Sequence, residues 1–330
     1  MRPFNYIAST SPADAVAANA GNPAPHYLGG GTNLIDLMKE DVERPETLIE
    51  VASLDRKEVE RTASGGLRLG AMLSNTETAN HPDVRRDYPL LTMTMLAAAT
   101  EQIRNMATNG GNLLQRTRCP YFYETSMPCN KREPGSGCGA INGMNALHAI
   151  FGWSESCVAT NPSDMNIALA AIGATVEVLQ PNGNSRRIPF ADFHRLPGDE
   201  PQRDNNLAPG ELIVGIELDP PKFSDNYYYL KIRERSSYAF ALVSVAAGMQ
   251  LEGGRITAAG LAMGGVSHKP WKLTAAEEYL VGKAPETATF EAAAEIAMRD
   301  ARPLEENEYK IEMGRRAVVR ALQQALDRTA

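Results

Sequence analysis

The chain has 330 residues, of which 43% are hydrophobic and 22% are charged. This composition is ordinary for a folded globular protein long enough to hold two domains. The net charge is −7 and the basic residues are dispersed, which argues against the basic face that nucleic-acid binding requires. No stretch reaches the roughly eighteen apolar residues of a membrane span. The first residues lack the apolar core of a signal peptide. We therefore expect neither nucleic-acid binding nor membrane insertion.

Residues 3–60 have the pattern of short alternating strands and helices. Ser11 followed by Pro12 and Asp14 is typical of a capped helix start. An apolar strand at 26–28 runs into a glycine triplet, and a helical pattern follows it. A further strand is predicted at 47–51.

The middle of the chain continues as strands and helices until residue 116. We predict a strand at 66–71 and one long helix over 88–104, with its leucines and methionines on one face. Segment 116–160 then interrupts this pattern with prolines, glycines and no sustained period. A structureless loop of this length is uncommon unless it is functional.

Regular structure resumes after residue 160 and continues to the C-terminus. The first part should contain a helix capped by Ser163 and strands at 174–179 and 212–218. We place a domain boundary between 224 and 225. Beyond it we expect strands at 227–232, 241–247 and 256–262, and helices at 275–280, 290–298 and 308–327. The predicted fold class is α+β in two parts.

Gly29, Gly30, Gly31, Thr32 and Asn33 form a turn between a strand and a helical segment. Glycines allow the backbone to approach an anion and to direct several N–H groups at it. The threonine and asparagine add side-chain donors, and we expect them to cap the helix that follows. The turn matches neither the dinucleotide fingerprint nor a phosphate-binding P-loop, so a plain glycine turn remains the alternative.

Thr108, Asn109, Gly110, Gly111 and Asn112 form a second glycine-rich, amide-rich segment. The simpler interpretation is the end of a helix followed by a turn, which is a common use of glycine. Together, however, two such loops could hold a pyrophosphate from both sides.

Asp164 and Lys231 are two further candidates. Asp164 follows Ser163 at a helix start, where a simple cap is the usual role, but its carboxylate would also suit ribose hydroxyls. Lys231 lies in an apolar, aromatic run. A strand lysine usually points to solvent, whereas a functional one could approach a flavin ring or a phosphate.

All four cysteines lie within the irregular segment 116–160, which we call the cysteine segment: Cys119, Cys129, Cys138 and Cys157. Nine, eight and eighteen residues separate them, so there is no close pair of the kind that zinc sites usually use. A disulfide pair, a zinc site and an iron–sulfur cluster all remain open. His148 is the one histidine between the first and last cysteine, and we consider it a poor alternative ligand.

The glycine segments at 29–33 and 107–112, Pro162-Ser163-Asp164, Glu211-Leu212-Ile213-Val214 and Lys231 together resemble one family. Their order and spacing are similar to those of the FAD-binding subunit of the xanthine dehydrogenase/aldehyde oxidase family of molybdenum hydroxylases. The resemblance covers essentially the whole chain.

The resemblance implies a two-part FAD-binding module of the vanillyl-alcohol-oxidase (PCMH) type over residues 1–224, with lobes at 1–60 and 61–224. A C-terminal α+β domain of the CO dehydrogenase flavoprotein type would occupy 225–330. The residues that would bind FAD by this resemblance are Gly29, Gly30, Gly31, Thr32, Asn33, Leu34, Thr108, Gly111, Asn112, Asp164, Ile213 and Lys231. No catalytic residue is assigned, because substrate would be oxidised on a partner.

Two runs of sequence around the first two cysteines, at 113–123 and 128–132, are similar to those of bacterial periplasmic aldehyde oxidoreductases. They narrow the resemblance to the FAD subunits of these enzymes. It implies that the four cysteines ligate an additional [4Fe-4S] cluster. The implied partners are a large subunit with the molybdenum cofactor, a small subunit with [2Fe-2S] clusters and an external electron acceptor.

Other interpretations stay open at this point. The FAD subunits of 4-hydroxybenzoyl-CoA reductase and of xanthine dehydrogenase are near alternatives, as is a standalone flavin oxidoreductase. A further alternative is a binding module that is held together by zinc or disulfides and has no redox role. The resemblance implies a periplasmic location, reached with a signal-bearing partner, whereas the chain alone would suggest the cytoplasm.

Overall fold

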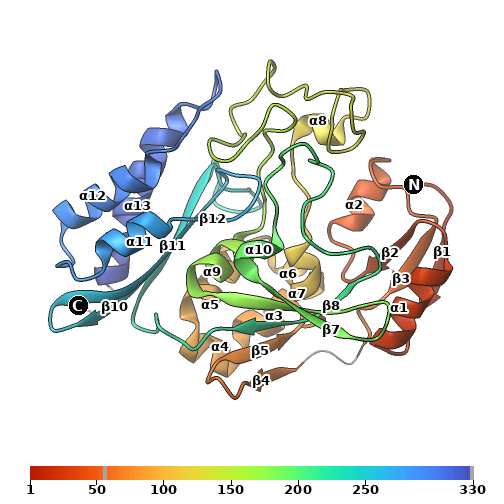
Figure 1. Ribbon diagram of the computed structural model, residues 1–330, viewed down its shortest axis with the longest axis horizontal. Helices are drawn as coiled ribbons and strands as arrows, with labels where there is room; N and C mark the ends of the chain where they lie inside the picture. The colour runs from red at the N-terminus through yellow and green to blue at the C-terminus, as the bar shows by residue number, and fades with distance from the viewer. Residues whose placement is uncertain (55–57, 328–330) are drawn as a thin grey trace.

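A computed structural model describes residues 1–54 and 58–327, and it arranges them around three β-sheets (Figure 1). Each sheet takes its strands from one continuous part of the sequence, apart from the long excursion between β5 and β6. The α+β class predicted from the sequence is confirmed.

The N-terminal sheet is small and entirely parallel, with strand order β1-β3-β2. Ser11 caps the first helix by accepting a hydrogen bond from the main-chain N–H of Asp14, as its sequence predicts. The elements of this lobe are β1 (Asn5–Ala8), α1 (Pro12–Gly21), β2 (Pro25–Leu28), α2 (Leu34–Lys39) and β3 (Thr47–Glu50).

The middle sheet is antiparallel, with strand order β4-β5-β8-β6-β7. Its strands are β4 (Val59–Arg61), β5 (Leu67–Gly70), β6 (Ala174–Leu179), β7 (Ser185–Pro189) and β8 (Leu212–Leu218). The helices that accompany it are α3 (Asn75–Asn80), α4 (Pro82–Asp87), α5 (Pro89–Ala97), α6 (Glu101–Met106), α7 (Asn109–Leu113), α8 (Pro120–Tyr123), α9 (Asp164–Ile172) and α10 (Phe190–Phe193).

The C-terminal sheet is also antiparallel, with strand order β12-β11-β10-β9. Three helices accompany it, of which the first and the third pack on the sheet and the second packs against the other two. Its elements are β9 (Asn226–Ile232), β10 (Val243–Glu252), β11 (Arg255–Gly264), β12 (Trp271–Lys272), α11 (Thr274–Leu280), α12 (Thr287–Met298) and α13 (Tyr309–Asp327). Figure 1 shows this domain at the left in blue, with the N-terminal lobe at the opposite end in red.

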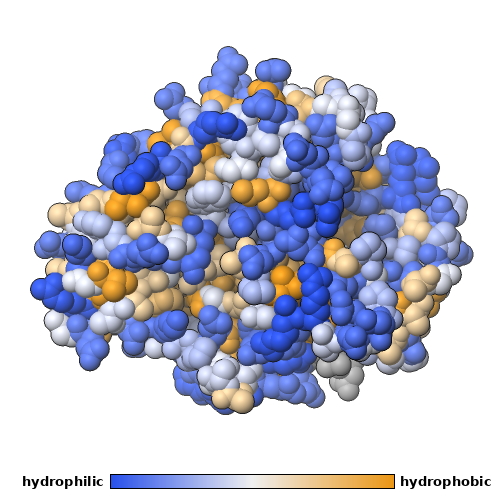
Figure 2. Space-filling model, in the orientation of Figure 1, coloured by the Kyte–Doolittle hydropathy of each residue, from blue (hydrophilic) through white to orange (hydrophobic). Residues whose placement is uncertain are grey.

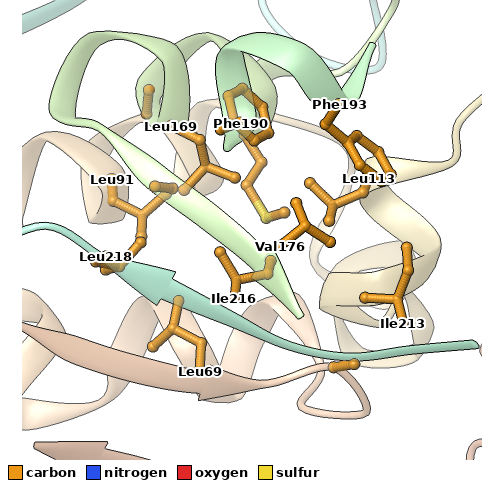
Figure 3. Packing of buried hydrophobic residues seen from close by; sticks show 14 of the residues in the cluster. Leu69, Leu91, Leu113, Leu169, Val176, Phe190, Phe193, Ile213, Ile216 and Leu218 are labelled. Carbon is orange, nitrogen blue, oxygen red and sulfur yellow. The ribbon is translucent and has the colours of Figure 1, made fainter. Parts of the chain in front are cut away.

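The core of the middle lobe forms between one face of its sheet and the helices beside it (Figure 3). Strand β6 alternates buried and partly buried side chains, so Val176 and Val178 enter the core while Glu177 stays outside. Leu91 and Leu169 contribute to the same cluster from α5 and α9. A second core lies in the C-terminal domain.

The prediction of one long helix over 88–104 is wrong. The chain forms α5 and α6 instead, because Ala98 adopts an extended conformation at the end of α5 and Thr100 caps the start of α6. Arg104 donates to the carbonyls of Ala98 and Ala99, which satisfies main-chain groups at the break. The 108–112 segment, expected as a turn, forms the short helix α7.

Segment 116–160 contains the short helix α8 and otherwise turns and isolated bridges, as its composition predicts. Figure 1 shows it at the top, above the middle lobe. It contacts the C-terminal domain through a bridge between Phe151 and Ser267 and the N-terminal lobe through packing of Phe122 on Leu37.

The surface is polar over most of the face in Figure 2, with apolar residues scattered among hydrophilic ones. None of the helices within residues 1–54 and 58–327 has the length and apolar character that a bilayer crossing requires.

Lys310 joins the cysteine segment to the C-terminal domain from a fully buried position in the first turn of α13. Its ammonium donates to the carbonyls of His148, at 3.0 Å, and Gly265, at 2.7 Å. Burial lowers the pKa of Lys310 to about 7.

We expect the unfolding free energy of the protein, relative to that of a Lys310→Met variant, to rise between pH 7 and about 10. In that range the folded lysine releases its proton, whereas in the unfolded chain it keeps a pKa near 10.4. Below about pH 7 it is charged in both states, so the cost of burying the charge is fully present. Urea unfolding of both proteins across this range measures the difference, and a difference that does not change with pH would contradict the prediction.

Candidate functional site

The two glycine segments meet at the junction of the N-terminal and middle lobes. A Cβ atom on Gly30 would lie 1.7 Å from the carbonyl oxygen of Met106, and one on Gly29 would lie 2.8 Å from Oγ1 of Thr108. Gly31 has φ +73°, a conformation that favours glycine. The two predicted loops therefore lie against each other, and the contact excludes side chains at two positions.

Asn33 does not cap α2, which corrects one prediction from the sequence. Its side chain makes no cap hydrogen bond; instead Oδ1 accepts from the main-chain N–H of Arg116 at 2.9 Å. Its Nδ2 group is buried and has no hydrogen-bond partner among the described residues. Thr32 is exposed beside it, and Leu34 begins the helix. The turn therefore carries one unused buried donor.

Thr108 caps α7 by accepting a hydrogen bond from the N–H of Gly111. The predicted ligand Asn112 is engaged within the protein. Its Nδ2 donates to Asn75 at 2.6 Å, and its Oδ1 accepts from Ser163 at 2.5 Å and from Gln115 at 2.9 Å. In this arrangement Asn112 links α7 to the start of α9.

Asp164 and Lys231, which are distant in the sequence, form a buried ion pair with 2.9 Å between Nζ and Oδ2. Tyr229 donates its hydroxyl to the other carboxylate oxygen. Burial raises the pKa of Asp164, although the lysine opposes that effect. Burial and the carboxylate raise the pKa of Tyr229 well above its ordinary value. The pair joins α9 of the middle lobe to β9 of the C-terminal domain.

The side chain of Ile213 lies in the core of the middle lobe (Figure 3). It is 3% exposed, and its Cβ would be 3.8 Å from a Cβ on Gly110 at the start of α7. The structure thus places Ile213 beneath the second glycine segment as a packing residue. Its part in FAD binding stays a prediction.

The four cysteines, separated by up to 38 positions, line one small cavity together with apolar side chains. All four are free thiols in the structure. Cys129 and Cys138 face each other in an isolated antiparallel bridge. Burial raises the pKa of Cys119 to about 12 and that of Cys157 to about 11. The thiols of Cys119 and Cys157 are therefore neutral near pH 7 when no ligand is bound.

The thiols do not converge on a single point. Among the described residues, no three His, Cys, Asp or Glu side chains are arranged to hold one metal ion. A zinc ion would need its sulfur ligands about 2.3 Å from a common centre. His148 lies beside this cavity, with Nε2 3.1 Å from Sγ of Cys119, and burial lowers its pKa to about 4.

The sequence analysis missed a group of charges behind the cavity. Lys131 is buried and contacts Asp204 and His268, and Arg116 donates to Asp204 at 2.9 Å. These partners lie more than seventy positions from Lys131 or Arg116 in the sequence. The one available signal was a lysine and an arginine inside a cysteine-rich loop, and such residues are usually exposed.

Comparison with known proteins places this architecture in a family. A model of the FAD-binding domain in molybdopterin dehydrogenase matches residues 2–221. A model of the CO dehydrogenase flavoprotein C-terminal domain matches residues 228–325. The chain belongs to the FAD-binding subunits of the molybdenum hydroxylase family.

Individual relatives agree with this assignment. The chain is 46% identical over 326 residues to the aldehyde oxidoreductase FAD-binding subunit PaoB of Escherichia coli (strain K12), covering 98% of this chain and 99% of PaoB. It is 25% identical over 280 residues to the glyceraldehyde dehydrogenase medium chain of Sulfolobus acidocaldarius, covering 85% and 82%.

Solved structures share the fold over the full length. A carbon monoxide dehydrogenase from Hydrogenophaga pseudoflava superposes with a TM-score of 0.77 at 24% identity, covering 100% of this chain and 99% of that one. Quinoline 2-oxidoreductase from Pseudomonas putida 86 gives 0.75 at 23%, with coverage of 100% and 99%.

The residues of the glycine segments suit the FAD that this family binds. Gly29 and Gly30 leave the main chain of this turn without side chains, because Thr108 and Met106 fill the space where each Cβ would lie. A bare main chain of this kind is typical of turns that direct N–H groups at an anion. The unused Nδ2 donor of Asn33 lies at the same turn. Both features fit the phosphate oxygens of a dinucleotide.

We expect Gly30→Ala to lower the free energy of unfolding by about 1–3 kcal/mol, because the added methyl group must displace the Met106 carbonyl. The protein should also retain less FAD. Gly21→Ala is the matched control, since a Cβ added at Gly21 would have no atom within 4 Å. Thermal unfolding and the flavin-to-protein ratio measure both effects. Equal stability and equal flavin content in the two variants would show that the close approach of Gly30 to Met106 does not restrict this position to glycine.

We expect Asp164→Asn and Lys231→Met each to cost about 3–5 kcal/mol of stability, because each leaves a buried charge without its partner. The double variant should lose less than the sum of the two single variants. Urea unfolding of the three variants tests this coupling. Losses that simply add would show that the two groups act independently.

Proposed function

We propose that this chain is the FAD- and [4Fe-4S]-containing electron-transfer subunit of a molybdenum-dependent aldehyde oxidoreductase. Two findings support the proposal. The chain is similar to an aldehyde oxidoreductase subunit over nearly its whole length, and its four cysteines line one cavity. The cysteine cavity is the single observation that carries the proposal beyond the family assignment.

The residues proposed to hold FAD fall into three groups. Gly29, Gly30, Gly31, Thr32, Asn33 and Leu34 would bind the pyrophosphate and ribityl chain together with Thr108, Gly111 and Asn112. The buried Asp164–Lys231 pair would orient polar groups of the cofactor, and Ile213 would support the second loop from below. FAD bound there would accept electrons delivered by the partner chains and pass them to an external acceptor.

The donor set suits a cluster better than a single ion. Four cysteine thiolates are the usual ligands of a [4Fe-4S] cluster. Each sulfur binds a different iron atom, so the thiols can surround a volume without converging on one point. Cys119, Cys129, Cys138 and Cys157 line one cavity without being placed to hold a single metal ion, which supports the proposal. Because the segment has little regular structure, the cluster would mainly order it.

The partners in this proposal are a large subunit with the molybdenum cofactor and a small subunit with [2Fe-2S] centres. Names such as FAD-binding subunit and medium chain among the relatives support an assembly of this kind. A division between residues 224 and 225 fits the two family models, which end at 221 and begin at 228. We also propose a periplasmic location, with the cytoplasm as the alternative, and fractionation of the native cell distinguishes them.

The protein co-expressed with its partners and purified without oxygen should contain one FAD and about four irons assigned to this chain. Absorption spectra with iron, sulfide and flavin assays measure the content. Flavin without those irons would remove the cluster from the proposal, and a chain without flavin would overturn it altogether.

A Cys129→Ser variant separates a structural cluster from one that carries electrons. We expect lower iron content and a lower unfolding temperature, while flavin reduction by aldehyde continues. Ser156→Ala is the control, since Ser156 lines the same cavity without offering a thiol. If aldehyde turnover alone collapses and stability is kept, the structural role is excluded.

A further inference from the structure

Lys131 is one of the residues that line the cysteine cavity, two positions after Cys129. Its side chain is 1% exposed, an unusual place for a lysine. The rest of the lining is largely apolar, including Phe122, Val158 and Ala159. A buried cation therefore belongs to the lining of a cavity that also includes four thiols and the polar residues Thr117, Asn130 and Ser156.

Every N–H donor of this ammonium has an acceptor. Nζ donates to the carbonyl of Pro201 at 2.7 Å, to the carboxylate of Asp204 and to Nε2 of His268 at 2.7 Å. Because an ammonium only donates, Nε2 of His268 accepts, and its Nδ1–H donates to the carbonyl of Arg195 at 2.9 Å. The histidine is thus neutral, which agrees with its pKa, lowered to about 4 chiefly by burial.

The charges around Lys131 are themselves balanced. Asp204 also accepts from Arg116, which pairs in turn with Glu43. Two cations and two carboxylates therefore form one chain of contacts, and Lys131 is the member at the cavity wall.

We infer that Lys131 is the counter-ion of the four-thiolate site, held beside it by Asp204 and His268, and that its charge sets the reduction potential of the cluster bound there. This inference rests on the cluster in the proposed function. Four cysteine thiolates bring negative charge into an apolar cavity, where a nearby cation is weakly screened. The reduced cluster carries one more negative charge than the oxidised one, so a cation stabilises the reduced form and raises the potential.

The experiment uses the complex with its partners and three variants, Lys131→Met, Lys131→Arg and Asp204→Asn. The midpoint potential of the [4Fe-4S] signal is followed by redox titration with EPR detection, and iron and sulfide are counted in each sample. We expect the potential to fall in Lys131→Met, because the cation is gone, and to rise in Asp204→Asn, because an opposing carboxylate is gone. Lys131→Arg should stay close to the unmodified protein.

These opposite signs distinguish a charge effect from a packing effect. Both substitutions disturb the same contacts, so a merely structural role would move the two potentials in the same direction or leave both unchanged, and either result overturns the inference. If Lys131→Met fails to retain iron, Lys131→Arg must restore both iron and potential, and failure to restore them is also a refutation. An unmodified complex without the cluster irons would refute the proposed function itself, which is a distinguishable result.

Discussion

The cysteine segment must satisfy the hydrogen bonds of a long irregular backbone inside the protein, and this constraint shapes the structure around it. Regular elements satisfy such groups internally, whereas an irregular segment needs side chains for the purpose. Arg132 donates to the carbonyls of Tyr121, Phe122, Thr125 and Met127. Asn130 accepts from the N–H groups of Gly135 and Gly137, and Asn145 donates to three carbonyls. Side-chain amides and one guanidinium thus make the hydrogen bonds that neighbouring strands would make in a sheet.

The same segment holds the other parts of the molecule together. Its Tyr123 donates to Asp36 in the N-terminal lobe at 3.0 Å. Its Asn145 exchanges two hydrogen bonds with Glu306 of the C-terminal domain. A ligand bound by the four thiols would therefore also support the packing of this segment against the N-terminal lobe and the C-terminal domain.

Local signals in the sequence predicted local structure well. The cap at Ser11, the alternation in β6 and the proline-rich irregularity of 116–160 each depend on neighbouring residues, and the structure confirms them. The predicted helix over 88–104 failed because its apolar pattern continues across a break at which Lys231 and Arg233 donate to the carbonyl of Ala97. The cap expected from Asn33 failed for the same reason, since a residue eighty-three positions away takes its side-chain oxygen.

Buried charges show most clearly what lies beyond a single sequence. The position of Lys231 in an apolar, aromatic strand predicted a functional role, and the structure gives it a buried partner in Asp164. Lys131 has no such context, since its neighbours are a polar loop, yet it is the more deeply buried of the two lysines. A charge is buried only where its partners converge, and the partners of Lys131 come from two other segments. Composition can therefore identify the thiols of this site, but only the fold can identify the cation that accompanies them.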